Sequence, residues 1–163
     1  SKNPVVAIGS RRKGEKMKIG ELARLSLCSV GTIRYYEKEG LLQKALRDQN
    51  NNYRYYDQQH LDTLMFIRRC RTLDMAQDEI KQLLQARSHP EADCNVINQL
   101  INEHLCHVQT RITELQALEK QLADLRDSCH DSQPTRDCGI LKELEHPQED
   151  LPVLTSKHIS STH

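Results

Sequence analysis

Three cysteines in the second half of this 163-residue chain could hold a soft metal ion. Cys94 precedes a long segment without proline or glycine, Cys129 directly follows that segment, and Cys138 comes nine residues later. All three lie in polar stretches rich in Asp and Ser, whereas a cysteine that only fills space is usually a small buried hydrophobe. Three thiolates on one ion favour cadmium, lead, mercury or zinc. We therefore predict a soft-metal site formed by Cys94, Cys129 and Cys138.

The segment between these cysteines is predicted to be one long helix over residues 93–128. Its apolar or near-apolar positions recur in steps of three and four, which is coiled-coil spacing: Ile97, Ile101, His104, Val108, Ile112, Leu115, Leu118, Leu122 and Leu125. At about 1.5 Å per residue the helix spans roughly 50 Å, so Cys94 and Cys129 cannot share an ion within one chain. The simplest partner for the stripe is the same helix of a second chain, antiparallel or parallel, and in an antiparallel homodimer Cys94 of one chain would meet Cys129 and Cys138 of its partner. The alternative is that the stripe packs back on the protein's own N-terminal domain.

A second, weaker metal site is predicted on the same helix at His104 and His107. The two histidines are three residues apart and share a helix face, and Cys106 lies between them. The partner chain, or His158 and His163 in the tail, would supply further ligands. The alternative places His104 in the dimer seam and His107 in solvent. For Cys28 and Cys70 we expect packing roles.

The charge of the chain is divided unevenly, although the net charge is zero. Residues 1–87 contain 17 Lys and Arg against 10 Asp and Glu, and residues 88–163 contain 6 against 13. This pattern predicts that only the first half binds a polyanion such as nucleic acid.

Two short helices, over residues 18–26 and from Ser29 to Glu39, are predicted to form a helix-turn-helix. A turn-rich polar loop over residues 47–52 and the run Tyr53–Tyr56 predict a small β-wing. Side chains that could reach phosphates or base edges of double-stranded DNA interleave charged and aromatic residues. The candidates are Thr32, Arg34, Tyr35, Tyr36, Arg54, Tyr55 and Tyr56. The alternative for either tyrosine of the pair Tyr35 and Tyr36 is a place in the core.

The predicted fold is mainly α: a winged helix-turn-helix head, a long dimerisation helix that forms an antiparallel coiled coil, and a C-terminal metal-binding loop. A third helix capped by Asp57 and a fourth over about 77–87 complete the head. We expect an N-terminal extension or tag, the DNA-binding domain, the dimerisation helix, a metal-binding loop with a short helix, and a flexible tail. Their boundaries are 1–16, 17–88, 93–128, 129–145 and 146–163.

Other features narrow the class of protein. No run of about 18 apolar residues exists, so no membrane span is expected. Six cysteines without a secretion signal indicate a reducing compartment, and we expect the cytoplasm. The chain shows no nucleophile–base pair and no paired carboxylates, so we predict that it is not an enzyme.

Several motifs resemble those of the MerR family of transcription regulators. The head resembles the family at residues 17–23, 32–37, 53–56, 66–71 and 78–80. Asp93-Cys94, Asn102-Glu103-His104 and the run from Asp137 to Leu141 resemble the cadmium- and lead-responsive branch. The resemblance covers about residues 17–145. It implies an antiparallel dimer whose metal site combines Cys94 of one chain with Cys129 and Cys138 of the other.

The same resemblance implies a function at promoters. The metal-free dimer represses a promoter whose two RNA-polymerase elements are set too far apart. Metal binding then bends and untwists the DNA so that the polymerase engages and heavy-metal resistance genes are activated. Cadmium or lead is expected, with mercury or zinc as alternatives, because the gap between Cys129 and Cys138 suits lead and mercury sensors alike.

The sequence also departs from the family pattern. Asn51 is expected to take the left-handed turn position usually held by glycine, and Ala76 stands where a threonine usually caps the fourth helix, a loss of about 1 kcal/mol. Two rival functions stay open: a metal-buffering or trafficking protein that does not bind DNA, and a thiol redox switch that uses Cys129 and Cys138.

Overall fold

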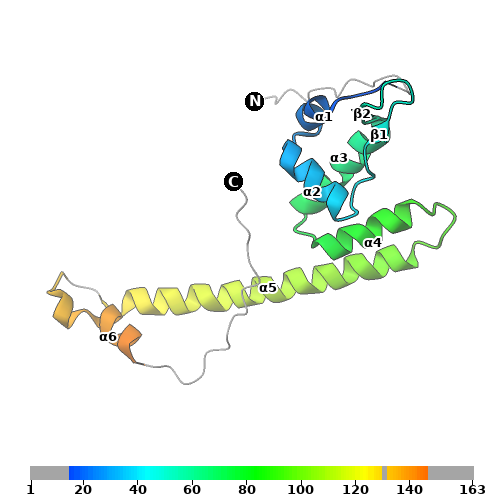
Figure 1. Ribbon diagram of the computed structural model, residues 1–163. Coiled ribbons are helices and arrows are strands. Elements are labelled where there is room, and N and C mark those ends of the chain that lie inside the picture. Colours follow the sequence, from blue (N-terminus) through cyan, green and yellow to red (C-terminus); the bar gives the residue numbers. More distant parts are fainter. Residues whose placement is uncertain (1–14, 130–131, 147–163) are drawn as a thin grey trace, which may run out of the picture. The chain divides into compact units, whose positions relative to one another are not determined.

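The computed structural model describes residues 15–129 and 132–146, and its chain divides into two compact units at Leu100 and Ile101. The predicted extension over 1–16 lies largely outside the described residues, as does the tail after His146. The first unit contains four helices, a two-stranded hairpin and the first turns of a long helix, and the second contains the rest of that helix and two short helices (Figure 1). The elements are α1 (Ile19–Ser26), α2 (Val30–Lys38), β1 (Leu46–Arg47), β2 (Arg54–Tyr55), α3 (Gln58–Thr72), α4 (Gln77–Arg87), α5 (Asn95–Asp127), η1 (Thr135–Asp137) and α6 (Gly139–Glu145). The mainly helical fold with a helix-turn-helix head is confirmed.

Helices α1 and α2 form the predicted helix-turn-helix. The chain leaves α1 through Leu27, whose φ of 55° reverses its direction. Ser29 then caps α2, because its Oγ accepts a hydrogen bond from the backbone N–H of Thr32 at 3.0 Å. Gly40, with a φ of 76°, ends the second helix where the sequence predicted.

The wing is a short antiparallel hairpin. Its register pairs Leu46 with Tyr55 and Arg47 with Arg54. The expectation for its turn was wrong by one residue: the left-handed position, with a φ of 58°, belongs to Asn52. Asn51 instead accepts a hydrogen bond from the Tyr53 N–H through Oδ1 at 3.1 Å, and thereby closes a local turn.

The ends of α3 and α4 are held differently. Asp57 caps α3, because its Oδ1 accepts a hydrogen bond from the His60 backbone N–H at 3.2 Å and lies 2.8 Å from His60 Nδ1. Ala76 precedes α4 and makes no side-chain cap, as predicted. The Glu79 carboxylate compensates in part, because its Oε2 accepts a hydrogen bond from the Ala76 N–H at 2.7 Å.

The core of the first unit consists of two neighbouring apolar clusters. The first joins α1, α2 and α3 and contains Met17, Leu22, Ile33, Leu42, Tyr56, Leu61 and Leu64. The second joins α3, α4 and the start of α5 and contains Leu41, Ile67, Cys70, Met75, Ile80, Leu83 and Leu100. Cys70 is buried and Cys28 packs against the first cluster, in the packing roles that we expected.

Most of the apolar stripe of α5 is not covered within one chain. Leu100 is the buried residue of this helix, and Ile97 packs beside it against the second cluster. Ile112, Leu115 and Leu122 are each about half exposed. The helix ends at Asp127, slightly earlier than predicted, because the Ser128 and Cys129 N–H groups bond to carbonyls three residues back. None of the described helices is both long and apolar enough to cross a membrane.

Candidate nucleic-acid interface and metal centre

A groove of about 520 Å³ on the first unit gathers four cationic side chains. We call it the cationic groove. Its lining comprises Lys18, Ile19, Arg34, Glu37, Arg47, Asn52, Tyr53, Arg54 and Tyr56. Glu37 is the one carboxylate of this lining, and it accepts a hydrogen bond from the Tyr56 hydroxyl at 2.6 Å. The remaining charge is positive and suits a phosphate backbone.

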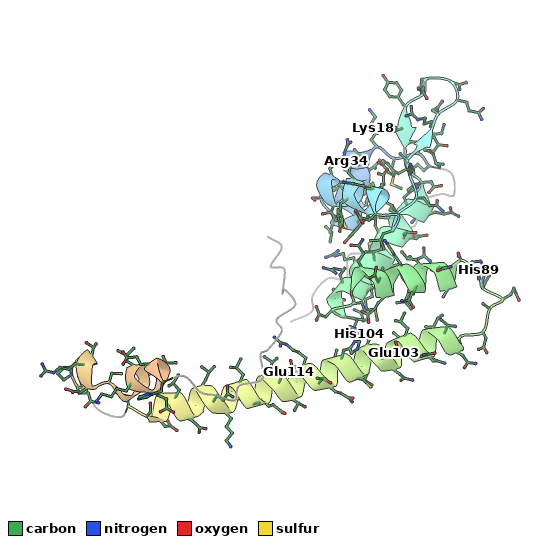
Figure 2. All side chains as sticks on the ribbon, turned by 60° about the horizontal axis from the view of Figure 1, so that its bottom comes forward. Lys18, Arg34, His89, Glu103, His104 and Glu114 are labelled. Carbon is green, nitrogen blue, oxygen red and sulfur yellow. The ribbon has the colours of Figure 1, made fainter. Side chains whose placement is uncertain are left out.

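Three separate elements position these cations. Arg34 lies on α2, while Arg47 and Arg54 face each other across the two-stranded wing. Lys18 follows Met17, whose backbone pairs with that of Tyr56 in both directions at 2.8 Å. Figure 2 shows Lys18 and Arg34 in the same region of the first unit, on neighbouring segments. The pairing of distant backbone segments thus builds one basic surface.

Three of the candidate DNA contacts, Arg34, Arg54 and Tyr56, line the cationic groove. Of these, Arg34 and Arg54 are exposed. Tyr55 lies on β2, where the Lys16 ammonium sits 4.8 Å from the centre of its ring. Thr32 lies in the first turn of α2, and its hydroxyl is 2.8 Å from the Ser29 hydroxyl.

The other tyrosines are engaged within the protein. Tyr35 is 48% exposed and its hydroxyl donates to Gln77 Oε1 at 2.9 Å. Tyr36 packs against both apolar clusters, and burial raises the pKa of its hydroxyl. Tyr56 is buried, and burial together with its bond to Glu37 raises its pKa. A DNA contact at each of these three positions stays a prediction.

Sequence reasoning missed Lys18 and Arg47 as members of the groove. Both lie close to motifs that were singled out, but neither has a local pattern that indicates a binding role. Their place depends on the Met17–Tyr56 pairing and on the hairpin register. A hydrogen bond that Arg47 Nη1 donates to Asn52 Oδ1 at 3.2 Å also orients the Arg47 side chain.

Two of the three predicted metal ligands meet in the second unit. Cys129 follows α5 and Cys138 precedes α6, and a hydrogen bond joins their side chains. We call Cys129 and Cys138 the thiol pair. Hydrogen bonds from the backbone N–H groups of Leu141 and Ile140, with a smaller contribution from Cys129, lower the pKa of Cys138. The thiolate is the form that binds soft cations, so a lowered pKa of the thiol favours metal binding.

Cys94 does not complete this site within one chain. It is exposed just before α5, and its carbonyl accepts the first bond of that helix from Asn98 N at 2.9 Å. The 33 residues of α5 separate it from Cys129. Among the residues that the structure describes, no cluster of three or more His, Cys, Asp or Glu side chains is placed to hold a metal.

The second predicted metal site lies on α5. His104 is half-buried and His107 is exposed there, with the exposed Cys106 between them (Figure 2 labels His104). His158 and His163 lie outside the described residues. A metal at His104 and His107 stays a prediction.

Two family models match the chain. The one described as MerR HTH family regulatory protein matches residues 17–87, and the one described as MerR, DNA binding matches residues 61–125. Among relatives, the HTH-type transcriptional regulator ZntR homolog of Haemophilus influenzae is 42% identical over 68% of this chain and 82% of its own length. The HTH-type transcriptional regulator ZntR of Escherichia coli K12 is 35% identical over 78% and 92%.

Solved structures agree with these matches. A crystal structure of the transcription regulator PbrR691 from Ralstonia metallidurans CH34 in complex with lead(II) is 49% identical, with a TM-score of 0.72 over 78% of this chain and 98% of that one. A crystal structure of MerR from Bacillus megaterium MB1 in complex with mercury(II) is 30% identical, with a TM-score of 0.63 over 80% and 100%.

The winged helix-turn-helix and its cationic groove define a DNA-binding regulator rather than an enzyme. The chain belongs to the MerR family of transcription regulators. The comparisons confirm the predicted class, a metal-responsive DNA-binding regulator, and they confirm that its relatives are not enzymes.

Proposed function

We propose that this protein is a homodimeric, metal-responsive activator that binds promoter DNA through the cationic groove. Its soft divalent ion is held by Cys94 of one chain and by the thiol pair of the other. The observation that carries the proposal is the contact between Cys129 and Cys138 in a chain that also carries a four-cation groove. We place this activity in the cytoplasm, where DNA is accessible and thiols stay reduced.

The thiol pair supports the proposal that the bound ion is a soft metal. Two converging sulfur atoms, one with a lowered pKa, fit cadmium, lead, mercury or zinc better than hard cations. Because PbrR691, which is 49% identical, was crystallised with lead(II), we favour cadmium or lead as the ion. Mercury is the alternative, because MerR of Bacillus megaterium, which is 30% identical, was crystallised with mercury(II).

The uncovered stripe of α5 supports the homodimer. Ile112, Leu115 and Leu122 are 49%, 48% and 57% exposed in the single chain. A second copy of α5 would cover them by coiled-coil packing. An antiparallel arrangement would also bring Cys94 of one chain to the thiol pair of the other. Light scattering should give the mass of a dimer at micromolar concentration, and the mass of a monomer would contradict this proposal.

The chain's own residues would do most of the work at the promoter. The cations of the groove hold phosphates, and the N-terminal half of α2 reads the major groove. When bound, the ion supplies a crosslink between thiolates of two chains. Because Cys94 belongs to one DNA-binding head and the thiol pair to the other chain, that crosslink would shift the two heads and distort the DNA toward a form that RNA polymerase can use.

Promoter-driven transcription during metal titration tests the proposal. Cadmium, lead, mercury and zinc would each be added to the protein, its operator and RNA polymerase, and the ultraviolet thiolate-to-metal band would be followed in parallel. Cys138→Ser should abolish both activation and the band while leaving metal-free operator binding unchanged. Cys106→Ser, which removes an exposed cysteine of α5, is the matched control. Activation that survives in Cys138→Ser would contradict the proposed site.

The contact within the thiol pair also favours a second candidate function, a redox switch. A peroxide would take two electrons and two protons from Cys129 and Cys138, forming a disulfide and water. This candidate requires that peroxide changes transcription in metal-free protein and that metal alone does not. The titration above distinguishes the two, because only the metal sensor responds under reducing conditions.

A further inference from the structure

Gly139 lies against a backbone carbonyl with no room for a side chain. A Cβ built on Gly139 would lie 2.1 Å from the Ser128 carbonyl oxygen and 3.0 Å from its carbon. Both contacts are to main-chain atoms, which cannot turn aside as the end of a long side chain could. Any residue other than glycine must therefore push the two backbone segments apart.

The two segments that touch are those that carry the thiol pair. Ser128 directly precedes Cys129, and Gly139 directly follows Cys138. The close approach of the Ser128 carbonyl to Gly139 therefore lies beside the hydrogen bond between the two cysteines. The crowded backbone contact and the two cysteines thus lie on the same two segments of the chain.

Other glycines in the described residues do not show this crowding. A Cβ at Gly20 or Gly40 would meet nothing within 4 Å, and at Gly31 it would meet only the Ser29 hydroxyl at 3.7 Å. Gly40 is needed for its φ of 76°, whereas Gly139 has no such backbone angle. The requirement at Gly139 is thus one of space alone.

We propose that Gly139 is a positioning residue that holds Cys129 and Cys138 at the separation needed to share one soft ion. The part that concerns the ion rests on the proposed function. To bring an added Cβ from 2.1 Å to at least 3.0 Å, the backbones must separate by about 0.9 Å. A displacement of that size is large for ligands that must converge on one atom.

If Gly139 served only as the first residue of α6, Gly139→Ala would be expected to stabilise the protein rather than to disturb the thiol pair. Gly139 is the first residue of α6, where alanine has the higher helix propensity and a less flexible unfolded chain. If the crowding had no consequence, Gly139→Ala would leave the thiol pair unchanged and stabilise the helix slightly.

The first test measures the thiol pair without any metal. In the full-length dimer carrying Cys94→Ser, the equilibrium between the two free thiols and their disulfide is set with glutathione buffers and mapped by mass spectrometry. Gly139→Ala should lower the effective concentration of one thiol at the other by about 100-fold. Gly20→Ala, a glycine with open space around it, should leave it unchanged. An unchanged value in Gly139→Ala would overturn the inference.

The second test measures cadmium binding in chains that keep Cys94. Gly139→Ala should weaken cadmium binding about 10- to 100-fold and alter the sulfur-to-cadmium band, while metal-free operator binding stays as in the parent. If the thiol pair separates and cadmium affinity does not change, Gly139 still positions the pair but the proposed metal site is wrong. The two failures are therefore distinguishable.

A measurement on the parent chain covers the case in which Gly139→Ala does not fold. Two thiols at the ends of a short flexible loop have an effective concentration of about a millimolar. A pair held by the Gly139–Ser128 contact should exceed that value by far. A value near a millimolar in the folded parent would overturn the inference without any substitution at Gly139.

Discussion

The Tyr35 hydroxyl donates a hydrogen bond to Gln77 Oε1 at 2.9 Å and so ties the second helix of the helix-turn-helix to the first residue of α4. Gln77 is also bonded through Nε2 to Glu39 at 3.4 Å. The tie lies outside the apolar clusters, so it fixes the relation of α2 to α4 without adding to the core. Tyr35 therefore has an internal role whether or not it also meets DNA.

We expect Tyr35→Phe and Gln77→Ala each to lower the free energy of unfolding by about 0.5 kcal/mol. Because both changes remove the same bond, the double variant should lose less than the sum, which urea unfolding can measure as a coupling energy. Gln85→Ala, an exposed glutamine on the same helix, should combine additively with Tyr35→Phe. If the effects of Tyr35→Phe and Gln77→Ala simply add, the hydrogen bond between these two side chains does not contribute to the stability of the first unit.

The cationic groove predicts that four substitutions each weaken DNA binding. Lys18→Ala, Arg34→Ala, Arg47→Ala and Arg54→Ala should each lower operator affinity, because each removes a charge that neutralises phosphate. The slope of log affinity against log salt should flatten by about one unit for each charge that no longer neutralises a phosphate. Titration by fluorescence anisotropy at several salt concentrations measures both effects. Lys120→Ala on α5 is the control. If a groove variant binds the operator as the control does, the side chain that it replaces does not contact the DNA backbone.

The cap of α3 predicts a pH-dependent loss of stability. Burial alone would raise the pKa of Asp57, but hydrogen bonds from the His60 side chain and backbone outweigh it and leave the pKa lowered. A lowered folded pKa stabilises the protein above the unfolded value of about 3.9, and this contribution disappears as pH falls through the folded value. Asp57→Ala should therefore cost about 1 kcal/mol at neutral pH.

The difference between Asp57→Ala and the parent should narrow below about pH 4, as followed by urea unfolding from neutral to acid pH. Asp124→Ala removes an exposed carboxylate of α5 that caps no helix, and it serves as the control. A difference that stays constant across this range would mean that the ionised Asp57 does not stabilise the cap.

A shared thiolate site predicts an unusual complementation between two inactive variants. Cys94→Ser and Cys129→Ser homodimers should each lose the three-sulfur site. In a heterodimer of the two, both lesions fall in one site and the other site is intact. The heterodimer should regain about one ion per dimer, with the thiolate-to-metal band at about half the parent intensity.

The band can be read in purified heterodimers that carry two different affinity tags. A site formed within one chain would be broken in both subunits and would give no recovery. Verified heterodimers without the band would therefore rule out the arrangement across two chains.

Local signals in the sequence predicted the elements well. Ser29 and Asp57 mark helix starts because their side chains bond to backbone N–H groups of the next turn, a relation contained within four residues. The range 77–87 for α4 was likewise predicted as the structure has it, and the short helix expected within 129–145 is found as α6. The turn position at Asn52 was missed by one residue, because Asn51 and Asn52 have the same propensity and only the hairpin register distinguishes them.

Relations between distant segments were not predictable in this way. Lys18 and Arg47 join the groove through pairing partners far away in the chain. Nothing in the local sequence around Gly139 indicates crowding. Its close approach to Ser128 depends on the path of the loop that connects α5 to α6. The cysteine spacing suggested candidate ligands for an ion, but it carried no signal for the backbone contact beside Cys129 and Cys138.

The backbone bonds between Met17 and Tyr56 also have a practical consequence for sensor engineering. They fix the chain immediately before Lys18, so a reporter protein fused ahead of Glu15 would be tethered a few residues from the cationic groove. Such a fusion would compete with the duplex for space and would lower the apparent sensitivity of a heavy-metal biosensor. A fluorescent reporter or an immobilising linker should therefore be attached beyond His146, on the chain that follows α6.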